Sequence, residues 1–109
     1  MRLILIAHLA AALLFLCGCG PARPLTESEF KGFCYQYDGL RQADCDTISV
    51  CGEYLSVTGQ PQASRAKCLE GCQRVYQPQF MRFINGGCAG AAQYARDWCE
   101  KFCVTNYPQ

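Results

Sequence analysis

The sequences CLEGC at residues 68–72 and CEKFC at residues 99–103 share one spacing, two cysteines four positions apart. Each stretch lies in a segment with apolar residues at helical spacing, and positions i and i+4 of a helix share one face. The Cβ atoms of such a pair are about 5–6 Å apart, whereas a disulfide requires about 3.8 Å. Neither pair can therefore close on itself, and we predict two facing helices that are joined by two disulfides.

Two pairings satisfy this geometry, and the direction of the helices decides between them. Antiparallel helices give the bridges Cys68–Cys103 and Cys72–Cys99, which is the pairing that we favour. Parallel helices would give Cys68–Cys99 and Cys72–Cys103. Both remain open from the sequence.

The cysteine content indicates four disulfides in the folded part of the chain. Two of the ten cysteines, Cys17 and Cys19, lie in the N-terminal segment. An even number of cysteines in a small exported domain is typical of a disulfide framework in an oxidising compartment. The eight that we expect to be bridged are Cys34, Cys45, Cys51, Cys68, Cys72, Cys88, Cys99 and Cys103.

The N-terminal segment has the features of an export signal. Arg2 supplies a positive charge, and residues 3–16 are apolar apart from His8. This apolar stretch is shorter than the about 20 residues that a membrane-spanning helix requires, and it fits the apolar region of a secretory signal. The alternative is a buried N-terminal helix, but the segment has no polar face to make it amphipathic.

The signal ends in the sequence LCGC at residues 16–19. An aliphatic residue, a small residue and a cysteine at positions 16, 18 and 19 resemble the lipobox of bacterial lipoproteins. The resemblance implies cleavage between Gly18 and Cys19, a diacylglyceryl group on the Cys19 thiol and an acyl chain, such as palmitate, on its amine. It also implies a place in the bacterial cell envelope, and Gly20 fits sorting to the outer membrane. Cleavage by an ordinary signal peptidase, which would release a soluble secreted protein, is the alternative.

These features divide the chain into a signal peptide at residues 1–18, a lipidated tether at residues 19–25 and a cysteine-rich helical domain at residues 26–109. Two or three acyl chains hold a protein stably at a bilayer, since each buried methylene contributes about 0.8 kcal/mol. The predicted partner of the N-terminus is therefore a membrane.

The domain is predicted to be all-α, a small disulfide-stapled bundle of four to five short helices. Capping residues and apolar stripes at helical spacing support each helix. Pro78 is expected to end the third helix, and the β-branched residues of the second leave a strand as its alternative. The expected helices are residues 27–37, a helix from Asp44 or Asp46 to Gly59, a helix from Pro61 or Ser64 to Pro78, a turn or two in 78–84, and 88–104.

Several function classes have no support in the sequence. His8 is the one histidine and is lost with the signal, so neither a Ser/His/Asp nor a Cys/His catalytic arrangement can form. Without Arg2, nine basic residues balance nine acidic ones, which gives no indication of nucleic-acid binding. We therefore expect no catalytic residues, no cofactor and no metal site.

Two functional hypotheses remain. The first is a lipid-anchored envelope lipoprotein with a structural or protein-binding role and an envelope protein as its partner. The second is a metal- or thiol-handling lipoprotein that uses cysteine thiolates, although the usual zinc spacing Cys-x-x-Cys does not occur.

The aromatic residues could serve either the core or a binding surface. We expect tyrosines such as Tyr35, Tyr54, Tyr94 and Tyr107 to pack around the bridges, and the apolar residues 80–84 to pack in the core. The alternatives are an exposed tyrosine-rich surface for a protein or glycan partner and, for residues 80–84, a contact surface such as one for a membrane.

Overall fold

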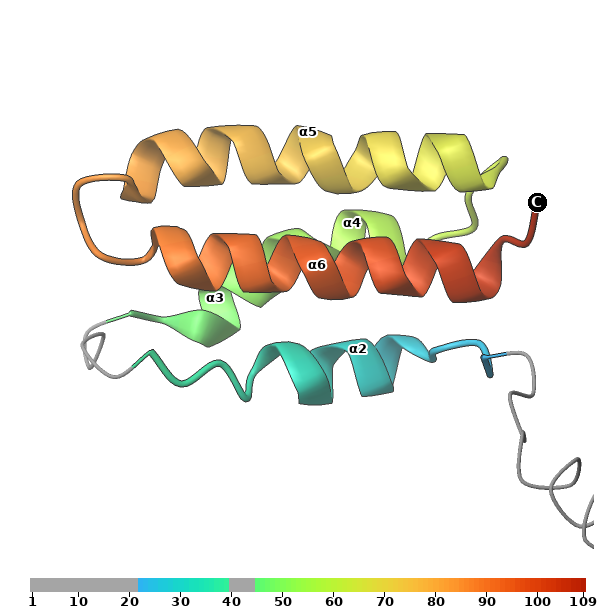
Figure 1. Ribbon diagram of the computed structural model, residues 1–109, viewed down its shortest axis with the longest axis horizontal. Helices are drawn as coiled ribbons and strands as arrows, with labels where there is room; N and C mark the ends of the chain where they lie inside the picture. Colours follow the sequence, from blue (N-terminus) through green and yellow to red (C-terminus); the bar gives the residue numbers. More distant parts are fainter. Residues whose placement is uncertain (1–21, 40–44) are drawn as a thin grey trace, which may run out of the picture.

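The computed structural model describes residues 22–39 and 45–109, and over these ranges the regular secondary structure is entirely helical (Figure 1). The all-α prediction is confirmed, and the alternative strand does not form in the described residues. The predicted signal peptide, residues 1–18, and the predicted lipidation residue Cys19 lie outside the described residues. Among the helices of the described part, none is long and apolar enough to cross a membrane.

The first described helix, α2, spans Glu27–Cys34. The Thr26 hydroxyl accepts a hydrogen bond from the backbone N–H of Glu29 at 3.1 Å, and the Glu29 carboxylate accepts one from the Thr26 N–H at 2.9 Å. This is the predicted capping box, which satisfies N–H groups that no helical carbonyl reaches. The helix ends earlier than predicted because the N–H of Gln36 bonds to the carbonyl of Phe33, a tighter 3₁₀-type turn.

The single helix predicted before Gly59 forms as two. The helix α3 spans Thr47–Glu53 and the short helix α4 spans Leu55–Thr58. Asp46 is the N-cap of α3, and its carboxylate accepts a hydrogen bond from the Ser49 N–H at 3.0 Å. Asp46 is one of the two capping residues predicted for this helix, whereas the interruption was not predicted.

The interruption occurs at Tyr54, whose side chain is fully buried. Its backbone N–H bonds to the Cys51 carbonyl, and the Val50 carbonyl instead accepts a hydrogen bond from the side chain of Gln79 at 2.9 Å. The Tyr54 hydroxyl donates to the Ala92 carbonyl at 3.1 Å. Burial raises the pKa of Tyr54 well above its usual range, so the phenol remains a neutral donor.

The longest helix, α5, spans Arg65–Phe83. Of the two predicted starting points, Ser64 is the N-cap, and its hydroxyl accepts a hydrogen bond from the Lys67 N–H at 3.1 Å. Pro61 instead lies outside the helix. The hydroxyl satisfies one of the free N–H groups of the first turn.

The prediction that Pro78 ends this helix is wrong, because α5 continues through it for more than one turn. An interior proline costs about 3 kcal/mol or more, since it removes a hydrogen bond and crowds the preceding turn. Contacts with α3 oppose this cost. Gln79 is fully buried against α3, and Arg82 forms an ion pair with Glu53 at 2.7 Å.

The last helix, α6, spans Ala89–Asn106 and is the centre of the fold. Figure 1 shows α5 and α6 as a long hairpin, with α2 along the other side of α6 and the shorter α3 and α4 nearby. Helix α6 contacts all four of these helices. Its small side chains permit close approach of its neighbours; the buried residues are Ala91, Ala92, Ala95, Cys99, Phe102 and Cys103.

Four disulfides join these helices. Two connect α5 with α6 and are described below. Cys34–Cys51 joins α2 to α3 with a Cα–Cα distance of 6.0 Å, and Cys45–Cys88 joins the residue ahead of Asp46 to the N-cap of α6 at 5.5 Å. Among the helices of residues 22–39 and 45–109, each except the short α4 therefore has a covalent tie to another helix.

Candidate functional site

The two disulfides between α5 and α6 are Cys68–Cys103 and Cys72–Cys99, with Cα–Cα distances of 5.5 and 5.8 Å. We call these four residues the sulfur ladder. The helices are antiparallel, and this is the pairing that the antiparallel arrangement requires. All four residues are fully buried.

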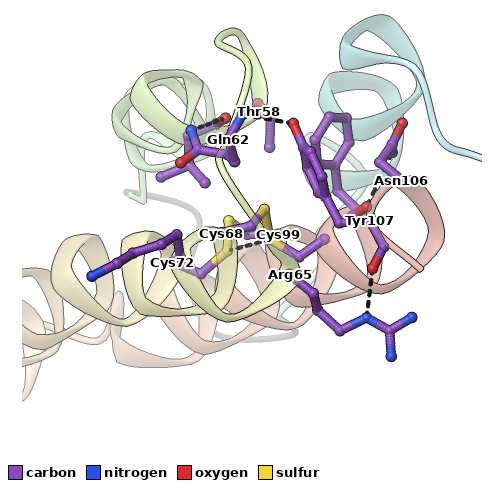
Figure 2. Close-up of a disulfide and its surroundings, with 12 residues drawn as sticks. Thr58, Gln62, Arg65, Cys68, Cys72, Cys99, Asn106 and Tyr107 are labelled. Atoms are coloured by element: carbon purple, nitrogen blue, oxygen red, sulfur yellow. Dashed lines mark hydrogen bonds between the residues drawn. A yellow bond between two sulfur atoms is a disulfide. The ribbon is translucent and has the colours of Figure 1, made fainter. Parts of the chain in front are cut away.

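The two rungs of the ladder touch each other (Figure 2). The sulfur of Cys72 lies 3.5 Å from the sulfur of Cys103, which belongs to the other bridge. The sulfurs of Cys72, Cys99 and Cys103 all lie within 4.8 Å of one another. The i, i+4 spacing on two facing helices thus concentrates sulfur at one place in the core.

As disulfides, these sulfurs have little chemical reactivity. The thiolate is the form of cysteine that attacks substrates and binds metals. Among the described residues, each of the eight cysteines is disulfide-bonded. In this oxidised state the ladder therefore joins the helices and offers no nucleophile.

A second feature is the end of the hairpin where the N-terminal tether joins the fold. The Leu25 N–H donates to the Thr105 hydroxyl at 3.3 Å, and the Asn106 amide donates to the Leu25 carbonyl at 2.8 Å. Close by, the hydrogen bond from the Thr26 backbone N–H and, after it, the ion pair with Arg23 lower the pKa of the Glu29 carboxyl. We call this the anchored end, because Leu25 is fixed there to the last turns of α6.

Arg65 ties the two helices of the hairpin at the same end. Its guanidinium donates to the carbonyl of Tyr107 at 2.7 Å (Figure 2). It also donates to the carbonyl of Val104 at 3.1 Å. A positive charge next to the last carbonyls of α6 also interacts favourably with the helix dipole. The Tyr107 hydroxyl accepts a hydrogen bond from the Gln62 N–H at 2.9 Å, which fixes the chain after α6.

An open pocket of about 540 Å³ lies at the anchored end, between the start of α5 and the last residues of the chain. Its lining includes Arg65, Leu69 and Pro108. Arg65 is the one charged side chain in the lining, and it is already bonded to carbonyls.

Aromatic side chains hold α2 against α6. The rings of Phe33 and Trp98 are stacked with centroids 4.3 Å apart, and Lys101 Nζ lies 4.6 Å from the Trp98 ring. The ring of Tyr94 meets the Trp98 ring edge-on, with centroids 6.4 Å apart. It also packs at a tilt against the Tyr37 ring, with centroids 5.3 Å apart. The stacked and edge-on geometries are those that aromatic pairs favour, so the cluster has a packing role.

The individual tyrosines follow the expected packing to different degrees. Tyr54 is fully buried, while Tyr94 and Tyr107 are half-buried. Tyr35 is exposed. Burial around the bridges is therefore complete for Tyr54 and partial or absent for the other three.

The expectation that residues 80–84 pack in the core is wrong for Met81 and Ile84. Their exposed fractions are 69% and 51%, while Phe80 and Phe83 are half-buried. Positions 81 and 84 are three apart on a helix and therefore share a face, which here points away from Gln79 and the core. We call Met81 and Ile84 the far-end patch, because they lie at the opposite end of α5 from the anchored end.

Sequence reasoning missed the roles of Gln79 and Arg65. Gln79 follows a proline in an apolar segment, where a polar residue with a buried partner could have been suspected. Arg65 carried no such signal, because its partners are backbone carbonyls about 40 residues away in the chain.

No protein-family model, no curated protein and no solved structure matches this chain. The features that bear on function are therefore those of the molecule itself: the sulfur ladder, the anchored end and the far-end patch.

Proposed function

We propose that this chain is a lipoprotein of the bacterial outer membrane, anchored through Cys19, whose stapled helical domain is a rigid, non-enzymatic binding module. The observation that carries the proposal is the sequence LCGC at residues 16–19 after an apolar signal. The disulfides agree with an oxidising compartment outside the cytoplasm.

The position of Leu25 gives the domain an orientation in this proposal. Six residue steps separate Cys19 from Leu25, and a fully extended chain covers at most about 3.6 Å per step, or roughly 20 Å in all. The hydrogen bonds of Leu25 fix this tether to the anchored end. The anchored end is therefore the end next to the bilayer.

The far-end patch is the surface that we assign to a protein partner. Helix α5 has 19 residues, which at about 1.5 Å per residue separate its two ends by roughly 28 Å. Met81 and Ile84 lie near the end that points away from the anchor, and they expose apolar surface there. Methionine in particular adapts its shape to different partners.

The alternative, a metal- or thiol-handling lipoprotein, requires reduced cysteines. The disulfides of the structure favour the binding module over this alternative, because a bridged sulfur is not a thiolate ligand. A thiol count on protein taken from the envelope separates the two hypotheses, since the binding module requires no free thiol.

The anchor is tested by labelling cells with palmitate and comparing Cys19→Ala with Cys17→Ala. The proposal predicts that Cys19→Ala abolishes labelling and leaves the protein unprocessed, whereas Cys17→Ala retains both labelling and membrane attachment. Equal labelling of the Cys19→Ala variant and the wild type would refute the anchor.

The partner surface is tested by cross-linking the protein to its neighbours in intact cells. The double variant Met81→Glu/Ile84→Glu should lower the yield of a specific cross-linked partner by about tenfold or more, since the loss of a few central apolar contacts costs more than 1.4 kcal/mol. Val104→Glu is the matched control, because Val104 has an exposed fraction of 47% but lies at the anchored end. An equal loss in both variants would contradict the assignment.

A further inference from the structure

The sulfur atoms of the described residues fall into two groups that differ in chemistry. Eight of them belong to cysteines, and all eight are in disulfides. The other belongs to Met81, the one methionine of residues 22–39 and 45–109. A bridged cysteine has no thiolate, which is the form of cysteine that oxidants attack. Met81 is therefore the one sulfur in this part of the chain that a mild oxidant readily modifies.

The exposure of Met81 fits this chemistry. Its exposed fraction is 69%, the largest among the large apolar side chains of the described residues, whereas six of the eight cysteines are buried. Met81 lies near the end of α5, on the helix face that it shares with Ile84. An oxidant in the solvent reaches the thioether without any opening of the fold.

Oxidation of Met81 changes the character of the far-end patch. One oxygen atom on the sulfur converts a flexible apolar side chain into a polar one. Since the patch consists of Met81 and Ile84, the sulfoxide places a strong hydrogen-bond acceptor in a small apolar surface. A partner that buries this surface against apolar groups would leave the acceptor without a donor, which weakens binding.

We propose that Met81 is a reversible oxidation site, at which conversion to methionine sulfoxide turns off binding through the far-end patch. For the effect on binding, the inference rests on the proposed function, whereas the oxidation itself depends on the exposure of Met81. The oxidant is a peroxide, and a methionine sulfoxide reductase is the class of enzyme that restores the thioether.

Both steps balance in atoms and electrons. The thioether sulfur gives an electron pair to one oxygen of hydrogen peroxide, the O–O bond breaks, and the other oxygen leaves as water with both protons. In the reverse step, two thiols of the reductase supply two electrons and two protons. The S–O bond breaks, and the products are the thioether, water and a disulfide in the enzyme.

The site is tested by treating the full processed chain, with its bridges intact, with hydrogen peroxide. We expect the peptide that contains Met81 to gain about 16 Da, at a rate within about threefold of that of methionine in a short unstructured peptide. The reductases for the two sulfoxide epimers should then remove this oxygen from the folded chain. Met81→Leu keeps the apolar area but lacks the sulfur, so the same peptide of this control should gain no oxygen. A wild-type chain that stays unoxidised at residue 81, or a sulfoxide that the reductases cannot remove, would overturn the proposal.

The effect on binding is tested with the cross-linking experiment described for the far-end patch. Brief exposure of the cells to hydrogen peroxide should lower the yield of the specific cross-linked partner by about fivefold or more for the wild type. The yield for Met81→Leu should not change. If the oxidised wild type cross-links normally while Met81→Glu/Ile84→Glu does not, the control by oxidation is refuted. Normal cross-linking of both would refute the proposed partner surface, together with its control.

Discussion

Gly71 is a single residue that sets how closely two elements approach. A Cβ atom at this position would lie 3.0 Å from Cγ2 and 3.3 Å from Cγ1 of Val57. Val57 is buried and β-branched, so its side chain has little freedom to move aside. The absence of a side chain at residue 71 therefore allows α4 to pack directly on α5.

We expect Gly71→Ala to destabilise the domain by about 1–2 kcal/mol, because overpacking outweighs the gain in helix propensity. The matched control is Gly52→Ala, a glycine inside α3 where an added Cβ would meet no atom within 4 Å. That control should stabilise the domain by about 0.5–1 kcal/mol. Urea unfolding measures both changes, and a stabilising Gly71→Ala would contradict the packing described for α4.

At the scale of elements, the cysteine spacing could predict the α5–α6 pair, because the i, i+4 rule and disulfide geometry are local. The capping residues Thr26 and Asp46 similarly marked the starts of α2 and α3. The helix through Pro78 could not be predicted. It depends on the buried hydrogen bond from Gln79 to the carbonyl of Val50 in α3, and Val50 is 29 positions away in the sequence.

The break at Tyr54 escaped prediction for the same physical reason. Nothing in its neighbourhood in the sequence disfavours a continuous helix strongly enough to locate a break. The ring is held instead by burial and by a hydrogen bond to Ala92, 38 positions away. Of the candidate site, local rules predicted two bridges between these helices, whereas the choice of pairing, the anchored end and the far-end patch required the tertiary structure.

Removing one rung of the ladder should lower the free energy of unfolding less than removing both rungs. With one rung intact, the other closes only a short additional loop, and its replacement by two alanines should cost about 3 kcal/mol. Removal of both rungs opens the loops that they close, whose ends are 35 and 27 positions apart in the sequence. The free energy of unfolding should then fall by about 6 kcal/mol or more.

This prediction is checked by urea unfolding of Cys68→Ala/Cys103→Ala, Cys72→Ala/Cys99→Ala and the four-site variant. Cysteines are replaced in bonded pairs so that no new free thiol can exchange with another bridge. If either two-site variant were as unstable as the four-site variant, the rungs would not act as independent staples.

At the scale of the whole molecule, the proposed anchor and the proposed partner surface are at opposite ends of the stapled domain. The tether joins the fold at the anchored end, where Leu25, Thr105 and Asn106 are hydrogen-bonded. The far-end patch lies at the other end of α5. Disulfides between the helices keep these two ends at a fixed separation, which suits a module that presents a surface away from a membrane.

The most direct test of this account is the intact mass of the protein purified from bacterial membranes, alkylated without reduction. We predict a chain that begins at Cys19, carries diacylglycerol and an additional acyl chain, and gains no alkyl group, because its other eight cysteines are bridged. A chain without lipid, or one that takes up alkyl groups at these cysteines, would contradict the account.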